Sequence, residues 1–104
     1  AAEANAMYKI AEGKGLAEAM FNRATLYEDG HGVRQDYKRA RRLYEKAAKK
    51  ELPAAMNALG FMYQNGRGVD KDLRKARKLY EKAERLGDVG AMYNLGHMYH
   101  TGSA

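Results

Sequence analysis

The chain has 104 residues, a formal net charge of +6 and no cysteine, which limits it to one small domain without disulfides. The absence of cysteine also excludes a thiolate nucleophile and a cysteine-based metal site. The first residues lack a basic segment followed by an apolar run, so we expect no signal peptide. No stretch is apolar over the length of a bilayer, so we expect a soluble protein and leave its compartment open.

The sequence repeats itself with a period of 36 residues. Residues 19–47 and 55–83 are identical at 14 of 29 positions without a gap, which indicates an internal repeat. The same shift aligns residues 4–11 with 40–47, and the last segment with the one that begins at Ala55. The chain therefore opens on the second helix of a unit and closes on the first helix of another.

Hydrophobic spacing predicts a helix in each half of a unit. In the first helix of the unit, Ala55, Leu59 and Met62 recur at i, i+4 and i+7, which marks one buried face. In the second helix, Ala40, Leu43 and Ala47 recur in the same way. The predicted helices cover about 2–13, 17–29, 36–50, 53–65, 72–86 and 89–101.

Capping residues predict the ends of these helices. Asp36, Asp72 and Asp88 stand where a carboxylate can accept orphan backbone N–H groups at a helix start. Pro53 falls at a first helical position, where its missing N–H costs nothing. Glycines follow four of the helices and are predicted to be left-handed cap residues; they are Gly15, Gly30, Gly66 and Gly87.

One repeat domain is predicted over 1–104, divided into a half repeat at 1–16, full repeats at 17–52 and 53–88, and a half repeat at 89–104. Residues 55–83 read Ala-Met-x-x-Leu-Gly-x-Met-Tyr-x-x-Gly-x-Gly-Val and then Asp-x-x-x-Ala-x-x-Leu-Tyr-x-x-Ala. This pattern resembles the SEL-like repeat family, relatives of the tetratricopeptide repeats. The resemblance implies an all-α fold, an α-solenoid that winds as a right-handed superhelix of antiparallel helical hairpins. It also implies an adaptor that assembles other proteins, with the first helices of the units lining the concave side.

The face of the first helices that lies opposite the buried stripe is predicted to line this concave side. Its residues differ between units while the framework repeats, as expected of a recognition surface on a constant scaffold. We predict that a protein or peptide partner binds there; the alternative is that these are unselected surface positions. The predicted partner-binding residues are Phe21, Asn22, Thr25, Glu28, Asn57, Phe61, Gln64, Tyr93, Asn94, His97 and His100.

Most of the positive charge lies on the second helices of the units and forms a basic convex stripe. Such a stripe could track phosphates or an acidic partner. It lacks the interleaved aromatic residues and groove-reading helix of nucleic-acid-binding proteins, so we interpret it as a solvated face. Binding to nucleic acid or to an acidic surface is kept as a lesser alternative. The stripe comprises Arg39, Arg42, Lys46, Lys50, Lys75, Lys78 and Lys82.

No catalytic or cofactor-binding constellation is evident, so we predict neither an enzyme nor a bound cofactor or metal. The turn Gly30-His31-Gly32 follows a helix, whereas a phosphate-binding loop follows a strand, so turn geometry explains it. His97 and His100 could share one helix face as metal ligands, but no third ligand stands nearby in the sequence.

Each end of the chain carries half of a unit, and each half has an apolar face that an inner unit would cover. Solenoids need polar caps to stay monomeric, so we expect a tendency to stack head to tail as a homo-oligomer. The alternative to an interaction module is an excised or engineered structural scaffold without a native ligand.

Overall fold

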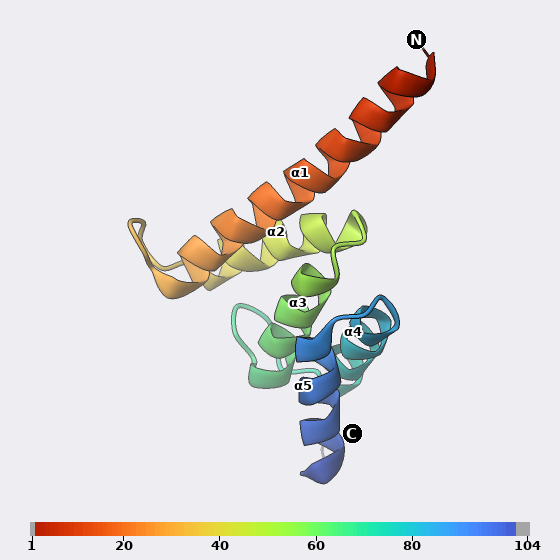
Figure 1. The fold of residues 1–104 in the computed structure, drawn as a ribbon. Coiled ribbons are helices and arrows are strands. Elements are labelled where there is room, and N and C mark those ends of the chain that lie inside the picture. The colour runs from red at the N-terminus through yellow and green to blue at the C-terminus, as the bar shows by residue number, and fades with distance from the viewer. Residues whose placement is uncertain (1, 102–104) are drawn as a thin grey trace.

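The computed structural model describes the backbone of residues 2–101 and the side chains of residues 15–101. Its described part is all α-helical and measures 53 × 33 × 18 Å. The helices are α1 (Ala2–Asp29), α2 (Tyr37–Lys49), α3 (Pro53–Asn65), α4 (Leu73–Arg85) and α5 (Val89–His100). The second half of α1 packs against α2, α3 packs against α4, and α5 follows at the C-terminal end (Figure 1).

The described residues form five helices where the sequence predicted six, because α1 runs through both of the first two predicted segments. Gly15 lies inside α1 and does not take the left-handed conformation that we predicted. At the equivalent positions, Glu51 and Gly87 have φ values of 64° and 93°, and the chain turns there. The helix before each of those turns packs against an earlier helix. Residues 2–14 have no earlier helix in the described chain, so the helical hydrogen bonds simply continue.

The other predicted helix ends are confirmed. The carboxylates of Asp36, Asp72 and Asp88 each accept a hydrogen bond from the backbone N–H three residues ahead, at 3.1, 3.0 and 2.8 Å. Pro53 lies in the first turn of α3, where no N–H is needed. The glycines that follow α1, α3 and α4 all have positive φ, as predicted for left-handed caps.

The core repeats along the chain as the sequence does. Helices α2 and α4 bury the same alanine, tyrosine and alanine positions, and α3 and α5 bury the same alanine, leucine and methionine positions. A Cβ atom on Gly60 would lie 2.8 Å from a ring carbon of Tyr80, so glycine is what lets α4 approach α3 this closely. The alternation of helices therefore follows from the 36-residue period of the apolar residues.

Neighbouring units stack through shared helices. Helix α3 contacts both α2 and α4, and α5 contacts both α4 and α3. The loop between α3 and α4 also touches the preceding unit, because a Cβ on Gly68 would lie 2.8 Å from the backbone of Tyr37. The result is an α-solenoid, as predicted. None of its helices, among the residues described, is both long and apolar enough to cross a bilayer.

Candidate functional site

The eleven predicted partner-binding residues lie on the second half of α1, on α3 and on α5, and we call them the A-helix face. The side-chain amide of Asn94 donates a hydrogen bond to the carbonyl oxygen of Asn57, over 2.9 Å. This bond joins α5 to α3 on this face, and Asn57 also lies against Gly90. The A-helix face therefore continues from one unit to the next.

Three residues of the A-helix face surround the buried Tyr44 of α2. The Tyr44 hydroxyl donates a hydrogen bond to Oε1 of Glu28 over 3.1 Å and lies 3.1 Å from Oγ1 of Thr25. The rings of Phe21 and Tyr44 are tilted by 54°, with centroids 5.6 Å apart. Burial raises the pKa of Tyr44, so its hydroxyl remains a neutral donor. Thr25 and Glu28 therefore both take part in hydrogen bonds within the chain.

The second unit repeats this arrangement at Gln64. The hydroxyl of Tyr80 in α4 donates a hydrogen bond to Oε1 of Gln64 over 2.6 Å, and burial raises the pKa of Tyr80. Glu28 and Gln64 are 36 residues apart, so the same position accepts the tyrosine hydroxyl in both units. The signal was present in the sequence as a polar residue at this position and a tyrosine at 44 and 80. From the sequence alone, we predicted a partner contact for this polar residue.

Replacing Glu28 with glutamine is expected to stabilise the fold at neutral pH. Burial raises the pKa of Glu28, against the lowering effect of the Tyr44 hydrogen bond. A carboxyl whose pKa is higher in the folded state favours folding below its unfolded pKa, and loses that contribution as pH rises through the folded pKa. Glutamine keeps an acceptor for Tyr44, as Gln64 does for Tyr80, without the buried charge.

Thermal unfolding measured from pH 3 to pH 8 tests this expectation. The melting temperature of Glu28→Gln should exceed that of the parent chain at pH 7, and the gap should close as the carboxyl becomes protonated. The exposed Glu18→Gln change serves as the control, because Glu18 lies on the same helix. A gap that is the same at every pH would contradict the buried-charge explanation.

Five members of the A-helix face have exposed side chains. Phe61 is 37% exposed and Tyr93 is 73% exposed. Asn22, His97 and His100 are also exposed. Tyrosine and phenylalanine are enriched at the cores of protein interfaces. Three of these five residues lie on α5, one lies on α3 and one lies on α1.

Arg67, in the loop between α3 and α4, lies beside this set and was not predicted. Its guanidinium stands 5.2 Å from the ring centre of Phe61 and 5.7 Å from that of Tyr37. Its charge also lowers the pKa of Glu28, in opposition to burial. The equivalent residue in the first unit is His31, so the repeat gave no reason to single out this position.

Among the residues that the structure describes, no group of three or more histidine, aspartate or glutamate side chains could hold a metal ion. His97 and His100 lie in the last turn of α5, and both are exposed.

All seven residues of the basic convex stripe are exposed, four from α2 and the turn after it and three from α4. Arg39 has a partner within the chain, because its guanidinium donates a hydrogen bond to the Tyr27 hydroxyl over 3.1 Å and covers that ring. Lys75 covers the ring of Tyr63 at 4.7 Å in the next unit, which is the equivalent pair. Part of the stripe is therefore used for contacts within each unit.

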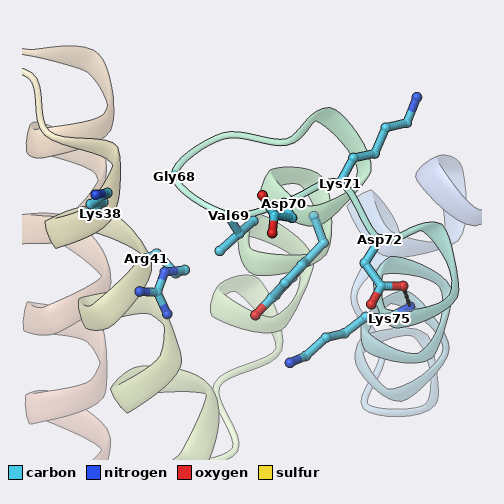
Figure 2. A pocket seen from close by; sticks show the side chains of 9 residues that line it. Lys38, Arg41, Gly68, Val69, Asp70, Lys71, Asp72 and Lys75 are labelled. Carbon is cyan, nitrogen blue, oxygen red and sulfur yellow. Dashed lines mark hydrogen bonds between the residues drawn. The ribbon is translucent and has the colours of Figure 1, made fainter.

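A groove of about 630 Å³ lies between α2 and the start of α4 (Figure 2). Basic side chains reach it from α2 and α4, and the loop from Gly68 to Asp72 borders it between these two helices (Figure 2). Of the residues that line this groove, the sequence analysis named only Lys75 as a candidate site residue, because the groove arises from the stacking of two units. Asp72 accepts from the Lys75 backbone and Arg41 pairs with Glu45, so several of its charges are satisfied within the chain. Its lining is Lys38, Arg41, Tyr63, Gly68, Val69, Asp70, Lys71, Asp72 and Lys75.

The fold and the A-helix face define an all-α solenoid of stacked helical hairpins. Residues 17–52, 53–88 and 89–104 each match the Sel1 repeat, so the chain belongs to the Sel1 repeat family, as the resemblance implied. Proteins of this family are generally non-catalytic scaffolds for protein interactions. No significant match is found among curated protein sequences.

Solved structures support the same assignment. A Sel1 repeat protein from Oxalobacter formigenes is 38% identical, with a TM-score of 0.80 over 84% of this chain. A protective antigen with an SLR fold from uropathogenic Escherichia coli is 35% identical, with a TM-score of 0.80 over 91%. Cysteine rich protein B of Helicobacter pylori is 32% identical, with a TM-score of 0.71 over 76%. The present chain spans 36%, 20% and 59% of their respective lengths.

Proposed function

We propose that this chain is a protein-interaction module that holds a protein or peptide partner on the exposed part of its A-helix face. The observation that carries the proposal is the pair of exposed aromatic side chains, Phe61 and Tyr93, on adjoining helices. The bond between Asn57 and Asn94 supports it, because it fixes those two helices side by side.

The chemistry of this surface favours an apolar or amide-rich partner segment. Helices α3 and α5 contain no Lys, Arg, Asp or Glu, so recognition would rest on aromatic contact and hydrogen bonding. Anchoring aromatics that fill a partner's pocket commonly account for most of a binding free energy. Exposed Asn22 and His97 supply further polar contacts at the edges of the same face.

The combined change Phe61→Ala and Tyr93→Ala is expected to weaken partner binding by at least about 10-fold, since hot-spot aromatics often contribute about 2 kcal/mol or more. Ligands are selected from a displayed peptide library on the parent chain, and their affinities are then measured on both chains. Both residues are exposed, so the fold should be preserved, which circular dichroism checks.

A matched control replaces Arg42 and Lys78 of the basic convex stripe with alanine; both are exposed and lie on the other helices of the units. Binding should be retained by this control. Binding that persists without the aromatics, disappears in the control and weakens steeply with salt would place the partner on the basic stripe and contradict the proposal.

A further inference from the structure

One face of α5 is left open, and we call it the α5 seat. It is lined by an apolar set on α5 and by the end of α4, around a depression of about 400 Å³. Met92 is 54% exposed and Tyr99 is 60% exposed there. Its lining is Glu81, Glu84, Arg85, Met92, Leu95, Gly96 and Tyr99.

The second unit shows what fits such a seat. The equivalent of Met92 is Met56, which is only 1% exposed because α4 covers it. A Cβ on Gly60 would lie 2.8 Å from the Tyr80 ring, whereas a Cβ on the equivalent Gly96 would have nothing within 4 Å. The α5 seat is therefore shaped like the α3 surface that receives α4, and no helix of the described chain fills it.

The helix that would fit carries alanine, a large apolar residue, tyrosine and alanine at the spacing of α4. Residues 2–14 of this chain have that sequence, and they form the N-terminal half of α1, which extends past α2 (Figure 1). This half and helix α5 lie at opposite ends of the molecule (Figure 1). The segment therefore cannot fill the α5 seat of its own chain. The equivalent residues are Ala4, Met7, Tyr8 and Ala11 in that segment, and Ala76, Leu79, Tyr80 and Ala83 in α4.

Gly15 stands where this segment would have to separate from the rest of α1. At the equivalent positions, Glu51 and Gly87 have positive φ, and the N–H of the following residue bonds back to the carbonyl of Ala47 or Ala83, at 3.3 and 3.0 Å. This is the six-to-one bond of a Schellman helix end. Glycine adopts that conformation without a Cβ penalty, so α1 can break at Gly15 where packing favours it.

We propose that residues 2–14 of one copy dock on the α5 seat of a second copy, with α1 breaking at Gly15. The docked segment completes the half unit that ends at α5, and the Tyr8 ring lies over Gly96 as Tyr80 lies over Gly60. His100 then stands beside the Tyr8 hydroxyl, at the position of Glu28 and Gln64 in the other units. When two copies dock, one of them still has a free α5 seat and the other still has a free segment. Further copies can therefore add at both ends, and the contact extends head to tail.

Sedimentation velocity over a range of concentrations tests the contact. The parent chain should form species that grow beyond a dimer as concentration rises. Gly96→Leu, which fills open space, should block the seat without disturbing the chain, and Tyr8→Glu should remove the apolar contact of the segment. Each variant alone should sediment as a monomer. His97→Leu, on the opposite side of α5, is the control and should associate like the parent.

Mixing the two variants gives the sharpest outcome. The Gly96→Leu copy still has its segment and the Tyr8→Glu copy still has its seat, so together they should form a 1:1 dimer that grows no further. A parent chain that stays monomeric at every concentration would overturn the proposal. So would a mixture that forms no dimer, or association of Tyr8→Glu by itself.

The break at Gly15 has a test of its own. Alanine at this position favours a continuous helix and disfavours positive φ, so Gly15→Ala should weaken association by roughly 10-fold or more. Circular dichroism should show that the isolated variant is at least as helical as the parent. An unchanged association constant would show that α1 does not open at Gly15 on docking.

Discussion

Replacing Gly68 with alanine is expected to lower the free energy of unfolding by about 2–4 kcal/mol. The backbone at Gly68 has φ of +69°, which an L side chain adopts at a cost of about 1–2 kcal/mol. A Cβ there would also lie 2.8 Å from the carbonyl carbon and oxygen of Tyr37. Backbone atoms at the start of α2 cannot rotate away, so the loop or the helix must shift.

Gly32 provides the matched control for this change. It is the equivalent residue one unit earlier, its φ is +73°, and a Cβ there would have nothing within 4 Å. Gly32→Ala should therefore cost only the backbone term, about 1–2 kcal/mol. Urea unfolding followed by circular dichroism gives both values, and their difference isolates the contact between the α3–α4 loop and the preceding unit. Equal losses in the two variants would mean that this contact contributes nothing to stability.

Most of the fold could be predicted because the repeat presents each framework position more than once. The aspartate caps, the first-turn proline and the buried alanines each have a local physical cause that the sequence displays. The helix end that we predicted at Gly15 was wrong, because this end depends on packing and not on a local cause alone. A glycine permits a turn, but the turn forms only where the helix before it has a surface to pack against. The sequence showed that a turn is sterically allowed at Gly15. It could not show that the described chain has no earlier helix for residues 2–14 to pack against.

The A-helix face could be located from the sequence, but the partners of its side chains could not. Periodicity places Glu28 and Gln64 on the first helices of their units. Their hydrogen-bond partners, however, depend on how the second helix of the unit crosses the first. That crossing brings a buried tyrosine hydroxyl within hydrogen-bonding distance of each. The groove in Figure 2 was missed for a related reason, since it forms between two units and belongs to neither.

These contacts explain how the units depend on one another. In a solenoid, stability is approximately the sum of terms within each unit and terms between neighbours. Helix α4 contributes to both kinds of term, because it packs against α3 of its own unit and against α5 of the next unit. Helix α5 packs against α4 and α3, and no later helix follows it in the part of the chain that the structure describes. Equivalent substitutions in α3 and α5 should therefore have unequal effects, and methionine offers the clearest pair.

Met56→Ala is expected to cost about 2–5 kcal/mol of unfolding free energy, because Met56 is fully buried beneath α4 and its loss leaves a cavity. Met92 is the same residue one unit later, on the open α5 seat, and is half exposed. Met92→Ala should change stability by no more than about 0.5 kcal/mol in dilute solution, as is usual for surface positions. Urea unfolding at low and high protein concentration measures both. At high concentration the cost of Met92→Ala should rise if the α5 seat is filled by a second copy. Equal effects of the two substitutions in dilute solution would mean that α5 is already covered within one chain, and would contradict the open seat.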